Sequence, residues 1–237
     1  MRLLALETCT EACSVALVNA GVVHERYELA PRRHAELVLP WIAALLAENG
    51  LARSDLDAIA VGRGPGAFTG VRLGISLAQG LALALERPLI GISTLAALAL
   101  RAGADEGGKV LAAIDARMGE VYWCSYQMRD GEPVALGDAQ VGAPHSVQIG
   151  GEDWLGVGSG FAAEKGALPR HLYAQLAHID AQALPHAADI ARLAVRAHAR
   201  GEALPPEQVE PVYLRNNVAL TIQAQQALRA AKADSGG

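Results

Sequence analysis

Two stretches of the chain share the same order of apolar and polar positions. Residues 3–18 hold an apolar run that ends in Glu7, then a polar turn and a second apolar run. The order recurs over residues 110–128, where the first run ends in Asp115. Short apolar runs bounded by turn residues predict buried strands. The repeated order predicts an internal duplication.

Helical and strand patterns alternate between and after these two openings. The spacing of apolar residues and the turn residues predict helices at 34–49, 70–86, 93–102 and 187–199, and strands at 56–62, 88–92 and 154–157. This alternation predicts an α/β protein with two stacked lobes and a cleft between them. We assign residues 1–103 to an N-terminal lobe, 104–223 to a C-terminal lobe and 224–237 to a flexible tail.

A loop with four glycines, residues 62–70, joins a predicted strand to a predicted helix. Such a loop can turn sharply and direct free N–H groups at an anion. It lacks the Lys-Ser or Lys-Thr pair of a P-loop. Phosphate contact and a thin turn without a ligand therefore both stay open, and Thr69 is predicted to be an N-cap. The candidates for phosphate or cleft contacts are Glu7, Thr8, Gly64, Gly66, Thr69 and Asp115.

Small residues recur at every fourth position of the helix at 70–86: Gly70, Gly74, Ala78 and Ala82. A glycine costs a helix about 1 kcal/mol relative to alanine. Close approach of another helix offsets that cost. The approaching helix is either the one at 34–49 in the same chain or a helix of another subunit, and the two do not exclude each other. The stripe predicts a docking surface.

Charge and composition limit the possible partners and compartment. The formal net charge is −5 and no run of Lys or Arg occurs, so we do not expect this chain alone to hold a nucleic-acid backbone. The cysteines, Cys9, Cys13 and Cys124, lack metal-ligand spacing and are expected as free thiols in a reducing compartment. The start resembles no export signal and the apolar stretch 73–85 is short for a bilayer, so we expect a cytoplasmic protein off the membrane.

Several runs resemble the TsaB (YeaZ) family, the accessory subunits of the bacterial machinery that builds threonylcarbamoyl-adenosine in tRNA. The most specific block is Gly-Pro-Gly-Ala-Phe-Thr-Gly at residues 64–70, in which Ala67 replaces the commoner Ser. The matching runs are residues 4–17, 62–80, 90–95, 113–122 and 211–215.

The resemblance implies a duplicated, two-lobed fold of the actin/Hsp70/sugar-kinase type (ASKHA, RNase H-like). It also implies a heterodimer with a related catalytic subunit, TsaD, assembly with a small ATPase, TsaE, and a homodimer of the isolated chain. The tRNA would be held indirectly, mainly by TsaD, and ATP and metal would belong to the partner subunits. The implied pairing surface consists of Leu37, Trp41, Leu45, Gly70, Leu73, Gly74, Leu77, Ala78 and Leu81.

The catalytic relative carries a His-x-x-x-His metal motif after the strand that corresponds to residues 88–92. Here Thr94 and Leu98 stand in the two ligand positions, and a leucine binds no metal. None of the seven histidines has another three or four residues later. The resemblance therefore implies a subunit with no metal site and no catalytic residue of its own.

Two rival functions remain. A stand-alone actin-fold phosphotransferase would hold Mg²⁺ with Glu7 and Asp115 and a nucleotide on the Gly-x-Gly-x-Gly pattern at 156–160, which contains no basic residue. A peptidase would need a nucleophile among Ser14, Ser93 and Ser125, none of which lies in a nucleophile elbow. No His–acid pair is identifiable for it from the sequence.

Overall fold

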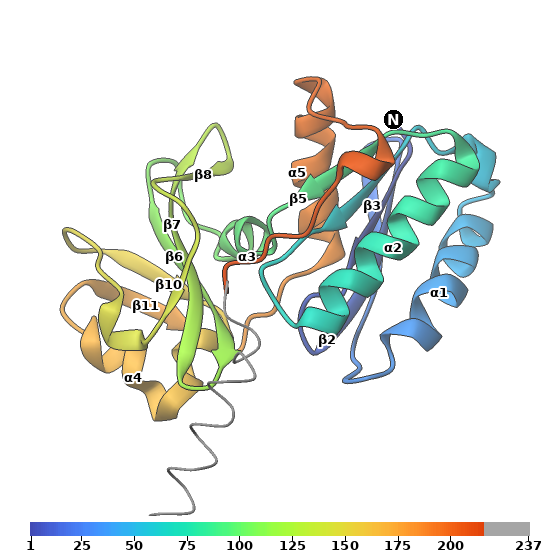
Figure 1. Ribbon diagram of the computed structural model, residues 1–237. Coiled ribbons are helices and arrows are strands. Elements are labelled where there is room, and N and C mark those ends of the chain that lie inside the picture. The colour runs from blue at the N-terminus through green and yellow to red at the C-terminus, as the bar shows by residue number, and fades with distance from the viewer. Residues whose placement is uncertain (216–237) are drawn as a thin grey trace, which may run out of the picture.

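The computed structural model describes residues 1–215, which form two lobes, each built on one mixed β-sheet (Figure 1). The first sheet has the order β3-β2-β1-β4-β5 and the second the order β11-β10-β6-β7-β8, with β9 also paired to β7. The strands are β1 (Leu3–Glu7), β2 (Ala12–Asn19), β3 (Val22–Leu29), β4 (Ala58–Gly62), β5 (Leu89–Ile92), β6 (Lys109–Arg117), β7 (Glu120–Arg129), β8 (Glu132–Ala135), β9 (Gln140–Gly142), β10 (Trp154–Val157) and β11 (Leu176–Asp180).

The two sheets repeat one topology. In each, three strands form an antiparallel meander (β1–β3 and β6–β8), and two later strands add in parallel beside the first strand of that meander. The predicted duplication, and with it the two-lobed actin/Hsp70/sugar-kinase-like α/β fold, is confirmed. Glu7 and Asp115 lie at or near the ends of the equivalent strands β1 and β6.

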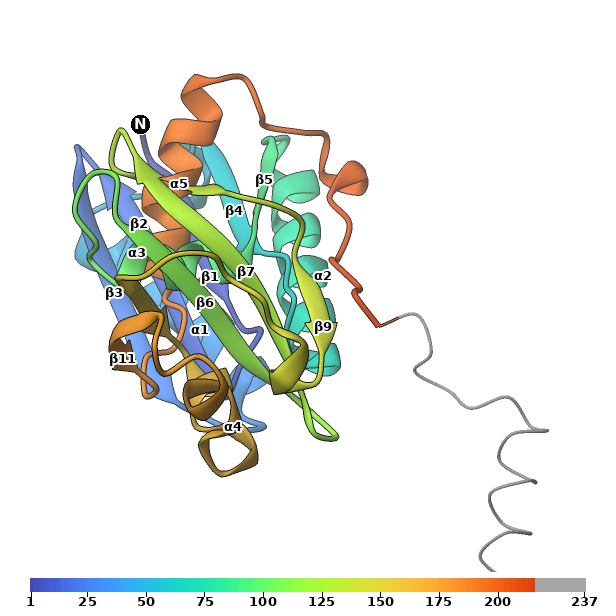
Figure 2. The same cartoon turned by 90° about the vertical axis from the view of Figure 1, so that its left-hand side faces the viewer.

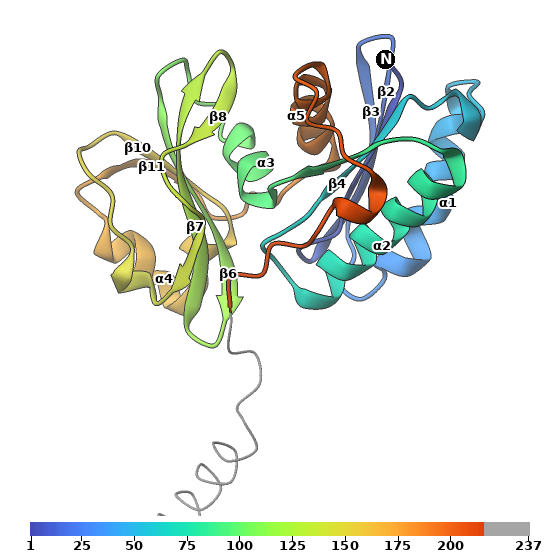
Figure 3. The same ribbon diagram turned by 45° about the horizontal axis from the view of Figure 1, so that its top comes forward.

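Helices cover both faces of each sheet. They are α1 (His34–Glu48), α2 (Phe68–Leu85), α3 (Thr94–Arg101), α4 (Ala163–His171) and α5 (Ala187–Ala199), and short 3₁₀ turns span Arg53–Asp55, Pro144–Ser146, Ser159–Phe161 and Pro206–Gln208. Since side chains alternate along a strand, Leu4 and Leu6 of β1 face α1 and α2, whereas Leu3 and Ala5 face α5. Helices α3 and α5 lie between the two sheets (Figure 3).

The predicted border of the C-terminal lobe, 104–223, is wrong for its last part. Helix α5 packs on the first sheet, with Ile190 and Ala194 in one cluster with Leu3 and Ala5. The chain then runs back along α2 (Figure 2). The predicted tail, 224–237, lies outside the described residues.

Helix α2 begins earlier than predicted. It starts at Phe68 rather than Gly70, and its N-cap is Ala67, so the prediction of Thr69 as the cap is wrong. Its 18 residues are enough, by length and composition alone, to cross a membrane, a test that core helices of globular proteins also pass. Val71, Ile75 and Ala78 pack into the core of the first lobe.

Candidate functional site

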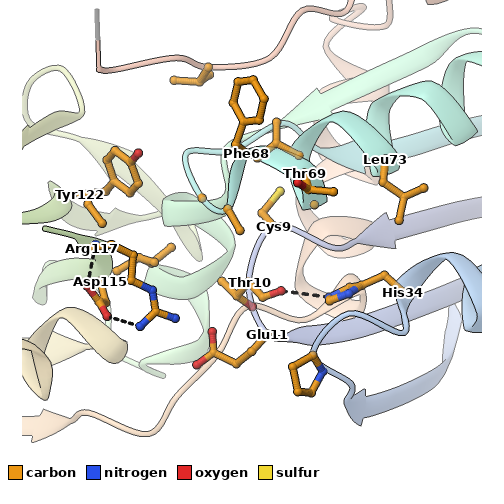
Figure 4. A pocket seen from close by; sticks show the side chains of 18 of the residues that line it. Cys9, Thr10, Glu11, His34, Phe68, Thr69, Leu73, Asp115, Arg117 and Tyr122 are labelled. Atoms are coloured by element: carbon orange, nitrogen blue, oxygen red, sulfur yellow. Dashed lines mark hydrogen bonds and ion pairs between the residues drawn. The ribbon is translucent and has the colours of Figure 1, made fainter. Parts of the chain in front are cut away.

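A cleft of about 740 Å³ lies between the lobes (Figure 4). Its first wall comes from the turn after β1, the start of α1 and the start of α2, including Thr10, His34 and Phe68. The hairpin between β6 and β7 forms the second wall, with Asp115 and Tyr122. Residues 212–215 border the opening.

The predicted cleft residues divide into two groups. Gly66, Thr69 and Asp115 line the cleft, and their role as phosphate contacts stays a prediction. Glu7, Thr8 and Gly64 are buried and do not line it, so their assignment as cleft contacts is wrong.

Glu7 is fully buried and holds parts of its own chain together. Its Oε1 accepts a hydrogen bond from the N–H of Cys9 at 2.6 Å, and its Oε2 accepts one from the Thr94 hydroxyl at 3.1 Å. Thr94 Oγ1 in turn accepts from the N–H of Gly64 at 3.2 Å. Burial raises the pKa of the Glu7 carboxyl, against the lowering effect of these hydrogen bonds. Thus Thr94 fixes the glycine loop to β1.

Thr8 anchors the start of α2, because its hydroxyl donates to the carbonyl of Gly70 at 2.8 Å. A side chain on Gly70 would overlap the carbonyl oxygen of Thr8, and one on Gly66 would overlap that of Cys9. The glycine loop is therefore thin because the turn after β1 lies directly against it. Close packing within the chain explains these glycines without a ligand.

Asp115 faces the cleft but is engaged by its own turn. One carboxylate oxygen accepts from the N–H of Arg117 at 2.7 Å, and the other pairs with the Arg117 guanidinium at 2.8 Å. Glu7 lies buried outside the cleft, so the predicted Glu7–Asp115 magnesium pair is wrong. Within residues 1–215, no three His, Cys, Asp or Glu side chains gather where they could hold a metal ion.

The glycines at 156–160 are packing positions, and their assignment to a nucleotide loop stays a prediction. A Cβ on Gly156 would lie 2.6 Å from the Phe161 ring, and one on Gly160 would lie 2.8 Å from the Ala113 side chain. One on Gly158 would overlap the carbonyl of Ala113. The loop lies directly against β6 and Phe161, and this close packing explains the three glycines without a ligand.

The small-residue stripe of α2 faces the chain's own sheet. Gly70, Gly74 and Ala78 are buried, and a Cβ on Gly74 would lie 2.5 Å from Thr8 Oγ1. Leu45 is also buried. The prediction that these four residues present a docking surface is wrong. The small residues instead allow α2 to pack closely against the chain's own sheet, at β4 and the turn after β1.

The other predicted pairing residues remain accessible. Leu37, Trp41, Leu73, Leu77 and Leu81 are half-buried. A second row of small residues, Ser76, Gly80 and Ala84, lies exposed on α2 at four-residue spacing. Within residues 1–215, no heavy atom outside the helix backbone and the adjacent residues lies within 4 Å of where the Cβ of Gly80 would be, so packing in this part of the chain does not explain that glycine.

Sequence reasoning missed the groups at the opening of the cleft. Arg72 lies over the ring of Phe68, 3.6 Å from its centre, and its Nε donates to the Tyr213 hydroxyl at 2.7 Å. Arg215 donates to the Ala116 carbonyl at 3.3 Å and forms an ion pair with Glu120. Phe68 and the run 211–215 carry the family resemblance, but nothing in their spacing shows that they meet.

A family model and the sequences of known proteins match most of this chain. The family model described as tRNA N6-adenosine threonylcarbamoyltransferase, TsaD, matches residues 18–222. The chain is 45% identical to the tRNA threonylcarbamoyladenosine biosynthesis protein TsaB of Escherichia coli, over 92% of this chain and 96% of that protein. It is 39% identical to the protein of the same name from Haemophilus influenzae, over 92% and 95% of the two chains.

Two solved structures from Pseudomonas aeruginosa share the fold at 48% identity. One is YeaZ, with a TM-score of 0.81, and the other is described as an uncharacterized protein with similarity to peptidase YEAZ, with a TM-score of 0.84. Each match covers 90% of this chain and 99% of the other. On the strength of these matches, the chain belongs to the TsaB (YeaZ) family.

Proposed function

We propose that this chain is a non-catalytic subunit required, in the cytoplasm, for threonylcarbamoylation of the adenosine next to the anticodon of tRNA. It acts by pairing with a TsaD-like catalytic subunit and by helping to recruit a TsaE-like ATPase. The observation that carries the proposal is the 45% identity to a protein named for threonylcarbamoyladenosine biosynthesis over nearly the full length of both chains.

The site chemistry supports a non-catalytic role. Thr94 holds the glycine loop where the catalytic relative has a metal ligand, and Glu7 is buried behind that loop. A cofactor, ATP or metal would then be supplied by the partner subunits.

Two of the three serines of the peptidase alternative, Ser14 and Ser93, form structural contacts. Ser14 Oγ accepts from the N–H of Ala187 at 2.8 Å, and Ser93 Oγ accepts from that of Ala96 at 3.4 Å, as the N-cap of α3. His34 and His171 bond to backbone carbonyls and His186 to Glu25. These contacts favour a structural role for Ser14 and Ser93.

The exposed side of α1 and α2 is the pairing surface in this proposal. Half-buried Leu73, Leu77 and Leu81 flank the exposed row of Ser76, Gly80 and Ala84. Small residues allow two helices to approach closely, and the leucines supply apolar area to bury. Leu37 and Trp41 of α1 extend the same surface, which would also pair two copies of the isolated chain.

Reconstitution of the modification tests the role. Catalytic subunit, ATPase, tRNA and the remaining substrates are combined with and without this chain, and modified adenosine is quantified by mass spectrometry of digested tRNA. We expect modification to require the chain, and the chain alone to produce none. Full yield in its absence would refute the proposal.

Substitution of Gly80 separates pairing from folding. Gly80→Leu removes an exposed helical glycine and therefore does not lower the free energy of unfolding, because leucine is the better helix former. In a closely packed interface the new side chain holds the helices apart, so we expect heterodimer affinity to fall at least about tenfold. Titration calorimetry with the catalytic subunit measures this, with Gly80→Ala as the matched control that adds a single methyl group. If the folded Gly80→Leu variant binds the catalytic subunit with unchanged affinity, the interface does not include this side of α2.

A further inference from the structure

Four arginines that are far apart in the sequence lie around the opening of the cleft. Arg32 follows β3, Arg72 lies on α2, Arg117 lies on the β6–β7 hairpin, and Arg215 lies near the end of the described chain. Arg32, Arg117 and Arg215 line the cleft, and Arg72 lies at its rim against Phe68. The sequence contains no run of Lys or Arg, yet the fold brings these four arginines to one surface.

Aromatic rings gather at the same place. The chain has only two Phe, three Trp and five Tyr, yet Phe68, Tyr122 and Tyr213 all line this cleft. Phe68 is 48% exposed and Tyr213 is 46% exposed. Tyr122 projects from the other lobe across the cleft from Phe68 (Figure 4). A chain poor in aromatic residues thus leaves three rings accessible in one concave place.

Phe68, Arg72 and Tyr213 form a prearranged set of planar groups. The guanidinium lies 3.6 Å from the centre of the Phe68 ring and 5.6 Å from that of Tyr213, and the two rings are 6.0 Å apart. The hydrogen bond from Arg72 to the Tyr213 hydroxyl fixes this arrangement. Arg72 is therefore held at the rim by an aromatic hydroxyl.

The nearby acids limit what the cleft can attract. Asp115 pairs with Arg117 and Glu120 pairs with Arg215, while Glu11 lines the first wall. The opening is thus only weakly cationic, unlike a groove that follows many phosphates. Stacking, with a few charge contacts, is the interaction that this surface offers.

We propose that this opening binds tRNA directly, stacking an unpaired base on Phe68 and Tyr213. Unpaired RNA bases are recognised by stacking on aromatic rings and on arginine planes, which are the groups gathered here. The inference rests on the proposed function, which brings tRNA to the complex. It differs from the indirect contact expected from the sequence. Its surface adjoins the exposed row of Ser76, Gly80 and Ala84, because Phe68 and Arg72 continue the same four-residue spacing toward the start of α2.

Ultraviolet cross-linking in the reconstituted complex tests the contact. Unmodified tRNA is bound to the complete assembly, irradiated and digested, and the cross-linked peptides are identified by mass spectrometry. We expect cross-links at Phe68 or Tyr213. Their absence from both residues, with cross-links found on the partner subunits, would overturn the proposal.

Variants test the energetic contribution. Phe68→Leu combined with Tyr213→Leu keeps apolar bulk but removes both rings, and we expect tRNA affinity of the complex to fall about tenfold. The dependence of affinity on salt should stay the same, because no phosphate contact is removed. Tyr173→Leu is the matched control, since Tyr173 is 80% exposed and lies outside the cleft.

The remaining outcomes separate this proposal from its alternatives. If the double variant loses the heterodimer on size-exclusion chromatography, the rim is a protein contact and the RNA proposal is wrong. Unchanged tRNA affinity with an intact complex also overturns it. The proposed function is refuted separately, by full modification of tRNA in the absence of this chain. If the chain is required but the double variant binds tRNA normally, only the direct RNA contact is refuted.

Discussion

Gly70→Ala is expected to lower the free energy of unfolding by about 3 kcal/mol, because the added methyl group has no space. It would overlap the carbonyl oxygen of Thr8, which is backbone in the turn after β1. That turn cannot retreat without losing the hydrogen bond from the Thr8 hydroxyl to the Gly70 carbonyl at 2.8 Å. Urea denaturation of the full chain, followed by circular dichroism, measures the loss.

Gly80→Ala is the matched control on the same helix. In the described part of the chain, no heavy atom of another segment lies within 4 Å of the position of the new methyl group, so we expect the free energy of unfolding to rise by about 1 kcal/mol. The two substitutions are chemically identical, but Gly70 lies in the first turn of α2 against Thr8, whereas Gly80 lies in the interior of the helix on its exposed side. Equal effects at Gly70 and Gly80 would contradict the packing described for α2.

The same comparison shows what helical periodicity predicts and what it does not. The four-residue spacing correctly indicated that Gly70, Gly74 and Ala78 share one side of a helix in close contact with a neighbour. It did not identify the neighbour, because a helix pattern is the same whether a sheet or another subunit covers it. The sheet covers that side, which leaves the unnoticed row that includes Gly80 as the accessible one.

The duplication was visible because the first two strands of each lobe are strongly apolar. Later parts of the second lobe were missed for physical reasons. Strand β11 is mostly exposed and lacks clear alternation, and α4 contains Pro169 and a left-handed turn at 164–166. Helix α5 was predicted at its observed bounds, yet its packing on the first sheet depends on contacts distant in sequence.

Glu7 and Asp115 illustrate the same limit at the candidate site. Both end an apolar run followed by a turn, so the pattern treats them alike. In the fold, Glu7 is enclosed by Thr94 and the glycine loop, whereas Asp115 lies in a hairpin that borders the cleft. Burial depends on which segments close over each acid, and the sequence pattern around the acid does not contain that information.

Below pH 4.5, where the Glu7 carboxyl is protonated, Glu7→Ala is expected to lower the free energy of unfolding by about 3 kcal/mol. It removes a buried side chain and leaves the N–H of Cys9 without its acceptor, 2.6 Å away in the native chain. The Thr94 hydroxyl loses its acceptor as well. Chemical denaturation measures the loss, and an unchanged stability would show that the glycine loop does not depend on this carboxyl group.

Glu7→Gln, nearly the same shape without the ionisation, tests the electrostatic part. Burial raises the pKa of the Glu7 carboxyl above its usual 4.5, so the folded chain holds the proton more tightly than the unfolded chain. The stability gained from that proton is complete below pH 4.5 and is lost as pH rises from there through the raised pKa of the folded state. Glutamine keeps an acceptor for Cys9 and never ionises, so its stability relative to the native chain should rise with pH across this window and then level off. A difference between the two proteins that stays constant with pH would show that the pKa of Glu7 is the same in the folded and unfolded chains.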